Sequence, residues 1–140
     1  MKTLFLLCLV VALALCETPP FLAGASKEAV AEWETLAAGF ADLSENEIVT
    51  KVNAYVAKHG EIKDAFEKFK AQVIADQSKA EEEHKVAIAK LSKEAQEADK
   101  KLLAISSDKS LKQKEKDVKI QEIFSSLPKA VVDELDKANA

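Results

Sequence analysis

The chain of 140 residues contains no arginine, three glycines, three prolines and two cysteines. Without arginine, it lacks the side chain that most often makes bidentate contacts to guanine edges and phosphates. Its net charge of −4 also repels a polyanion, so we expect no nucleic-acid partner. With so few glycines, the sequence has no glycine-rich loop of the kind that binds phosphate groups.

Sequence motifs of common enzymes are also absent. The chain has neither the G-x-S-x-G motif of serine hydrolases nor the H-E-x-x-H motif of zinc proteases. Paired carboxylates are numerous, but a chain with 24 acidic residues brings some of them together by chance. General acid–base chemistry needs titratable groups gathered at one site, and no segment gathers them. We therefore predict that the protein is not an enzyme.

The N-terminal segment has the pattern of a secretory signal peptide. Lys2 precedes an apolar run over residues 4–15. This run fits the roughly 7–15 apolar residues of a signal peptide and is shorter than the ~20 needed to cross a bilayer. The small residues Ala14 and Cys16 predict cleavage between Cys16 and Glu17.

A bacterial lipoprotein with an acylated Cys16 is the alternative, but Leu15 occupies a position where such signals have a small residue. We therefore assign residues 1–16 to a signal peptide and residues 17–140 to a single secreted, extracellular domain. Cys8 and Cys16 both fall in the leader, so the mature domain has no thiol. It must be stabilised by its core rather than by disulfides.

The charge of the mature domain is acidic. It carries 19 lysines against 24 acidic residues, a net charge of −5. Lysines concentrate in residues 109–119, but Glu115 and Asp117 interrupt this run. We interpret the run as a solvated helix face rather than a lipid-binding patch, and we expect no stable membrane association.

Apolar residues recur every three to four positions along the mature domain, which is the spacing of amphipathic helices. Ser26 predicts the start of a first helix. The apolar stripe of that helix is Val30, Trp33, Leu36 or Ala37, and Phe40. Ser44 and Glu47 form the S-x-x-E pattern of a capping box. They predict a second helix that ends at His59, with Gly60 in the left-handed conformation.

The stretch over residues 62–105 is periodic throughout and permits either one kinked helix or two helices. An uninterrupted helix of about 44 residues would be roughly 66 Å long, which exceeds the width of a compact domain of this size. We favour two helices separated near Ser92, a good N-cap. A helix over residues 111–127 and a short one that begins at Pro128 complete an all-α, compact bundle of about six helices. The last helix should bury Val131, Val132 and Leu135.

Four segments of the chain resemble those of a known family. They are PPFLAGAS at 19–26, EEEHKVAIAKLSKEAQEADKKLLAI at 81–105, DKSL at 108–111 and SLPKAVVDEL at 126–135. Their order after a signal peptide resembles the SXP/RAL family of small secreted nematode proteins. Relatives typically have LSPEA where this chain has LSKEA, so Lys93 replaces a proline that would enforce the start of a helix.

The resemblance implies an all-α fold of about six helices, loosely calmodulin-like in arrangement but without intact EF-hands. It also implies a secreted antigen or allergen that host antibodies recognise, and an association with divalent cations, chiefly magnesium. We therefore expect a non-enzymatic module at the host–parasite interface that binds Mg²⁺ weakly or acts through interactions. The oligomeric state stays open.

The best candidate for a cation site is the segment DLSENEIVTKVN, residues 42–53. Counted as an EF-hand loop, it places oxygen-bearing side chains at the first, third and fifth positions, namely Asp42, Ser44 and Asn46. The sixth and twelfth positions, which require glycine and glutamate, are Glu47 and Asn53 instead. Two defining positions of an EF-hand therefore fail.

The simpler interpretation of this segment is a turn between helices that the Ser44–Glu47 capping box closes. Incomplete protein coordination suits a hydrated Mg²⁺ better than a tightly bound Ca²⁺. Our hypothesis for a cation here is a weak, mostly water-mediated site that uses Asp42, Asn46 and Glu45.

The two histidines are weaker candidates as metal ligands. Glu81 and His84 have the E-x-x-H spacing of di-iron bundles, but such bundles need two copies of the motif. The other histidine, His59, has Val56 three residues before it. We interpret the first motif as a solvated helix face and His59 as a residue at a helix C-terminus, where positive charge is favourable.

A carrier of a small hydrophobic ligand, such as a fatty acid, is the alternative function. The aromatic residues that would line its pocket are Trp33, Phe40, Phe66, Phe69 and Phe124. The competing interpretation is that these side chains form the core of the domain. Self-association through the alanine-rich residues 80–98 is a third possibility.

Overall fold

The computed structural model describes residues 18–139, which form an all-α fold. Within this range there are six α-helices, three short 3₁₀-helices and no strand. The α-helices are α2 (Lys27–Ala38), α3 (Glu45–Lys58), α4 (Lys63–Ile88), α5 (Lys93–Ser106), α6 (Gln113–Ser126) and α7 (Lys129–Ala138). The 3₁₀-helices are η1 (Pro20–Leu22), η2 (Phe40–Asp42) and η3 (Gly60–Ile62). The predicted fold class is confirmed, whereas the predicted signal peptide lies outside the described residues.

Serine side chains begin three of the helices, as the sequence predicts. Ser26 Oγ accepts a hydrogen bond from the Ala29 N–H at 3.1 Å at the start of α2. Ser92 Oγ accepts one from the Ala95 N–H at 3.2 Å at the start of α5. Ser44 begins α3 with both hydrogen bonds of the predicted capping box. Each cap satisfies a backbone N–H that the first turn of a helix leaves without an intrahelical partner.

A turn over residues 89–92 separates α4 from α5. The stretch over residues 62–105 therefore contains two helices, with the break near Ser92 that we favoured. Lys93 is the first residue of α5. The serine cap is thus sufficient to begin this helix without a proline.

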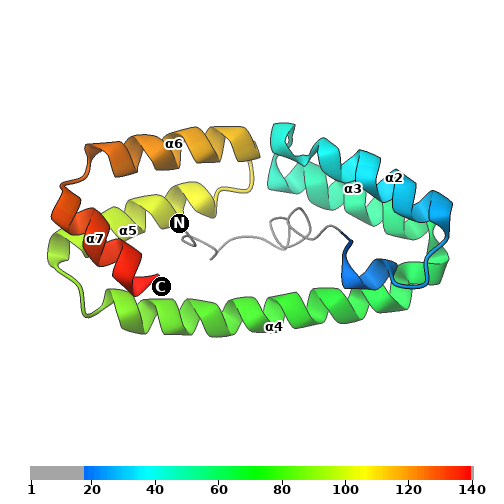
Figure 1. Cartoon of the computed structure of the whole chain (residues 1–140), viewed down its shortest axis with the longest axis horizontal. Helices are drawn as coiled ribbons and strands as arrows, with labels where there is room; N and C mark the ends of the chain where they lie inside the picture. Colours follow the sequence, from blue (N-terminus) through cyan, green and yellow to red (C-terminus); the bar gives the residue numbers. More distant parts are fainter. Residues whose placement is uncertain (1–17, 140) are drawn as a thin grey trace.

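The helices form an elongated ring (Figure 1). Helix α4 runs along one side of the molecule, with α2 and α3 paired at one end and α5 and α6 paired at the other. Helix α7 crosses between α5 and α4, and it contacts both. The loop between α2 and α3 meets the loop between α5 and α6 on the side opposite α4. No helix within residues 18–139 is both long and apolar enough to cross a bilayer.

The buried apolar side chains form two clusters rather than one continuous core. The N-terminal cluster contains Phe21, Leu22, Trp33, Phe40, Ile48, Val52, Tyr55, Val56, Ile62 and Phe66. The C-terminal cluster contains Ile88, Ala95, Ala98, Leu102, Val131 and Leu135. Helix α4 contributes to both clusters from its two ends, which lie about 39 Å apart at 1.5 Å per residue.

The end of α3 differs from the prediction. Gly60 does not adopt a positive φ. Among the glycines within residues 18–139, only Gly24 does. The helix ends at Lys58, with His59 as its C-cap at φ −108° and ψ 71°, and the chain continues directly into η3. A left-handed glycine is not needed, because the N–H of His59 still donates to the Tyr55 carbonyl at 3.0 Å.

The prediction that the lysine-rich run is a wholly solvated helix face is also wrong at one position. Lys116 lies in α6 and is 3% exposed, whereas the apolar Val118 of the same helix is 57% exposed. The stripe instead passes through Lys116, Ile120 and Ile123, which follow one another at helical spacing. In α7, Val131 and Leu135 are buried as predicted and Val132 is half-buried.

Candidate functional site

The loops between α2 and α3 and between α5 and α6 are joined by their backbones. Ser44 and Lys112 form an antiparallel bridge. The Asn46 N–H donates to the Lys109 carbonyl at 3.2 Å, and the Gln113 N–H donates to the Leu43 carbonyl at 3.1 Å. We call residues 39–46 and 107–114 the paired loops. They join two helix–loop–helix units, α2 with α3 and α5 with α6.

The two halves of the pair have the same local geometry. Ser44 and Lys112 are each the N-cap of the following helix, α3 and α6. The Ser44 N–H donates to Glu47 Oε2 at 2.8 Å, and the Lys112 N–H donates to Glu115 Oε2 at 3.0 Å. The hydrogen bond from the Ser44 backbone, followed by one from its hydroxyl, lowers the pKa of Glu47. Each bridge residue is therefore held by a glutamate three positions further on.

The three residues of the predicted cation site all lie at the paired loops. Asp42 is 67% exposed in its side chain, and its Oδ1 lies 2.6 Å from Lys114 Nζ. Glu45 is 13% exposed, and one of its oxygens lies 3.9 Å from Lys109 Nζ. The backbone of Asn46 takes part in the pairing described above.

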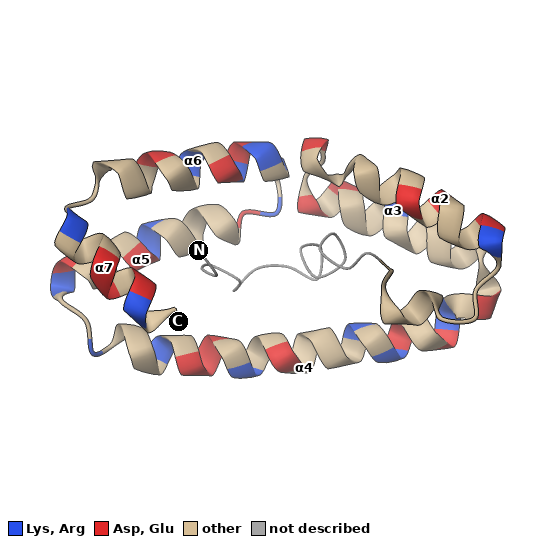
Figure 2. Ribbon diagram, in the orientation of Figure 1, with Lys and Arg blue, Asp and Glu red and all other residues tan. Residues whose placement is uncertain are grey.

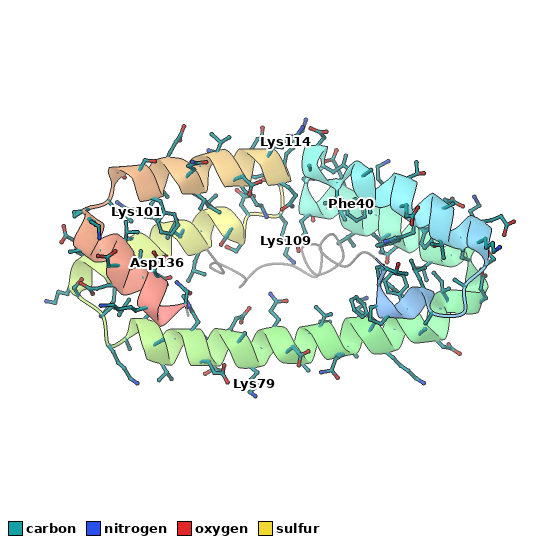
Figure 3. All side chains as sticks on the ribbon, viewed as in Figure 1. Phe40, Lys79, Lys101, Lys109, Lys114 and Asp136 are labelled. Carbon is teal, nitrogen blue, oxygen red and sulfur yellow. The ribbon has the colours of Figure 1, made fainter. Side chains whose placement is uncertain are left out.

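Lysines and carboxylates therefore face each other across the paired loops. In Figure 2 the lysine-bearing start of α6 lies opposite acidic residues between α2 and α3 and at the start of α3. Figure 3 labels Lys109 and Lys114 at this junction. The positive charge that a bound cation would bring is thus already present in part, as lysine ammonium groups.

The residues present fit a weakly held, hydrated ion better than a dehydrated one. Carboxylate and amide oxygens are the ligands that Mg²⁺ prefers, but Mg²⁺ keeps several of its waters. Among residues 18–139, no three histidine, cysteine, aspartate or glutamate side chains converge as a metal site. The exposed Asp42–Lys114 pair is of a kind that contributes about 0–1 kcal/mol, so exchange of the lysine for a cation costs little.

An intact EF-hand loop is not formed at this segment. Helix α3 begins at Glu45, so most of the EF-hand frame over residues 42–53 is helical. Glu47, at the sixth position of the frame, lies in the first turn of the helix and caps it. The ligands of an EF-hand follow an extended loop, which this backbone does not provide.

Lys116 belongs to the paired loops in space although it lies within α6. Its side chain is 4% exposed, and its Nζ donates to the Ser106 carbonyl at 2.9 Å. The same Nζ lies 3.9 Å from Glu45 Oε2. The sequence prediction did not include Lys116, although a lysine four positions before Ile120 on an apolar stripe is a signal of its burial.

The histidines form pairs rather than metal sites. His84 is buried, and its Nε2 lies 2.8 Å from Asp99 Oδ1, with side-chain exposures of 7% and 5%. The interpretation of this part of α4 as a solvated face is therefore wrong at His84, because α5 covers it. His59 Nε2 lies 2.8 Å from Glu32 Oε2, which Lys58 also contacts. Hydrogen bonds from Lys58 and then His59 lower the pKa of Glu32.

The five aromatic residues proposed for a hydrophobic ligand do not gather in one place. Trp33, Phe40 and Phe66 are buried in the N-terminal cluster, and Phe69 packs against it. Phe124 packs against the C-terminal cluster instead.

Phe21, which is not among the five predicted aromatic residues, is the centre of the aromatic contacts in the N-terminal cluster. Its ring centroid lies 5.1 Å from that of Trp33, 5.2 Å from that of Phe66 and 5.4 Å from that of Phe69. The first two contacts are edge-to-face, a favourable geometry for aromatic rings. These rings are in contact with one another, so a ligand among them would require the cluster to open.

Comparison with known proteins identifies one family over almost the whole chain. The family model of the SXP/RAL-2 family protein Ani s 5-like, metal-binding domain matches residues 1–139. The SXP/RAL-2 family protein Ani s 5 from Anisakis simplex is 38% identical over 120 residues, which is 85% of this chain and 79% of that protein. No solved structure matches the chain significantly.

Proposed function

The chain belongs to the SXP/RAL-2 family, and on this premise we propose that it is a secreted, non-enzymatic protein that binds a divalent cation weakly at the paired loops. The matched family model is that of a metal-binding domain, which supports cation binding. The choice of Mg²⁺ rests on the oxygen donors of the loops and on their incomplete coordination.

The observation that carries this proposal is the position of Asp42, Glu45 and Asn46 at one junction between two helix–loop–helix units. Asp42 would bind the ion after exchange with Lys114, whose pairing is exposed to solvent. Glu45 and Asn46 would act through water molecules, because the side chain of Glu45 faces lysines and the backbone of Asn46 is bonded to the other loop. A bound divalent ion would supply positive charge to this junction.

Calorimetric titration of Mg²⁺ into the mature protein tests the proposal. The variant pair Asp42→Ala/Asn46→Ala should lose most of the binding heat of the wild type. The matched control is Asp136→Ala/Asn53→Ala, which removes the same residue types from exposed positions on α7 and α3. If the first pair titrates like the wild type, the site at the paired loops is wrong.

Secretion and antibody recognition are part of the same proposal. They rest on the N-terminal pattern of residues 1–16 and on membership of the family. N-terminal sequencing of the exported protein should give Glu17 as the first residue. Binding of the mature protein by antibodies from infected hosts, measured against an unrelated helical protein, tests its role as an antigen.

A further inference from the structure

We infer that the ammonium group of Lys116 is the resident cation of the paired loops. Its side chain is 4% exposed and its Nζ is bonded to the Ser106 carbonyl at 2.9 Å. From there it faces Glu45 Oε2 at 3.9 Å, on the loop of the other helix–loop–helix unit. A charge of the protein's own therefore lies at the junction where a metal ion would otherwise be expected.

The equivalent position in the first unit shows that this charge is not required for packing. Ser44 and Lys112 are partners in the bridge, so the residues four positions after them are equivalent, namely Ile48 and Lys116. Ile48 is fully buried and apolar. Burial of an ammonium group is unfavourable unless it is paired and hydrogen-bonded, so a lysine at this place needs a compensating interaction. The Ser106 carbonyl and the Glu45 carboxylate provide it.

Lys116 also differs from ordinary surface lysines, which bury their carbon chain and keep the charged end in water. Lys109, which faces the same Glu45, and Lys114, which pairs with Asp42 on the same loop, are 67% and 64% exposed. The three lysines thus lie close together, but only Lys116 is buried. This makes Lys109 and Lys114 matched controls for Lys116.

A resident ammonium explains how the loops stay paired without a complete metal site. It balances Glu45 and links α6, through Ser106, to the end of α5. Tying the two helix–loop–helix units together in this way should not depend on a divalent ion. The inference stands on these contacts and does not need the proposed Mg²⁺ site to be correct.

Thermal unfolding of the mature protein in the presence of EDTA tests the inference. Lys116→Met keeps most of the length of the side chain but removes its charge, and it should lower the melting temperature by roughly 10 °C. Lys114→Met should shift it by no more than about 2 °C. A Lys116→Met variant as stable as the wild type would overturn the inference, because an apolar residue would then suffice as it does at Ile48.

Two further measurements keep the test decisive if Lys116→Met does not fold. Glu45→Gln retains both lysines and the shape of the side chain, and it should be less stable than Lys109→Met, which removes only the exposed partner. Equal stability of these two variants would count against the role of Lys116. A fall in the melting temperature of the wild type on adding EDTA would also overturn it, because a metal would then be the resident ion.

The outcome is separable from that of the proposed function. If Mg²⁺ gives no binding heat while Lys116→Met is destabilised, the metal site is wrong and the resident ammonium stands. If Mg²⁺ binds through Asp42 and Lys116→Met is as stable as the wild type, the metal site stands and the resident ammonium is wrong.

Discussion

Individual side chains in this fold are stabilised by specific partners that burial brings together. The hydroxyl of Tyr55 donates to the Ala29 carbonyl at 2.6 Å, and its ring packs against Trp33 and His59. Burial, because the phenolate form would lose its hydration, and then the negative charge of the nearby Glu32 raise the pKa of Tyr55 to about 12.

Titration of the phenolate should show this directly, because Tyr55 is the only tyrosine of the chain. Its pKa in the unfolded chain is near 10.0 and rises on folding, so the stability it contributes is complete below pH 10 and falls as the pH increases towards 12. Ultraviolet absorbance should give a midpoint near 12 in the folded protein and near 10 in denaturant. A folded-state midpoint near 10 would contradict the buried hydroxyl.

A second prediction at this scale concerns the capping box of α3. Ser44→Ala removes a cap and should destabilise the protein by about 1 kcal/mol, measured by urea unfolding.

The pKa of Glu47 is lowered by its hydrogen bonds from Ser44. The stability that Glu47 contributes is therefore present above its ordinary pKa of 4.5 and is lost as the pH falls through its lowered value. The loss of unfolding free energy at acid pH should therefore be smaller in the Glu47→Gln variant than in the wild type. In a Thr50→Ala control this loss should equal that of the wild type.

At the scale of helices, the first residues of three helices could be predicted from the sequence. The burial of some polar residues could not. The caps at Ser26, Ser44 and Ser92 depend on residues within the same turn, so a local pattern suffices. His84 and Lys116 are buried by neighbouring helices, which a pattern along one helix does not identify.

The pair of His84 and Asp99 is the buried polar contact between α4 and α5. Asp99→Leu leaves a buried imidazole without its partner and should cost about 3 kcal/mol. The double variant His84→Leu/Asp99→Leu should cost less than the sum of the two single variants, because both polar groups are then removed. Urea unfolding of the four proteins measures this coupling.

Strictly additive effects in that cycle would show that the contact contributes nothing. The exposed pair of Glu82 and Lys85 in the same helix is the comparison. Its Glu82→Ala variant should leave the unfolding midpoint unchanged, because solvent screens such a pair.

At the scale of the whole molecule, the sequence predicted the helices but not their division between two clusters. Periodicity shows which face of a helix is apolar and not which partner covers it. The candidate site shows the same limit: the sequence singled out Asp42, Glu45 and Asn46, whereas the lysines that face the two carboxylates lie 64 to 72 residues further along the chain. The partner loop is close only because the bundle closes into a ring (Figure 1).

Cooperative unfolding of the two apolar clusters should depend on α4. Trp33 is the only tryptophan and lies in the N-terminal cluster, so its fluorescence reports on that cluster alone. In the wild type, fluorescence and circular dichroism should follow one unfolding transition. Gln77→Pro breaks α4 between the clusters at a cost of about 3 kcal/mol or more, and the two signals should then separate. Coincident transitions in that variant, as in a Gln77→Ala control, would show that α4 does not couple the clusters.

The ring also means that the chain is continuous along one side and held by hydrogen bonds and ion pairs between the paired loops along the other. A protease that cuts α4 after Lys79, whose side chain is 79% exposed, would produce two fragments that each retain a cluster and one of the paired loops. The nicked molecule would behave as a heterodimer of its own halves, migrating intact on a native gel and coming apart only in denaturant.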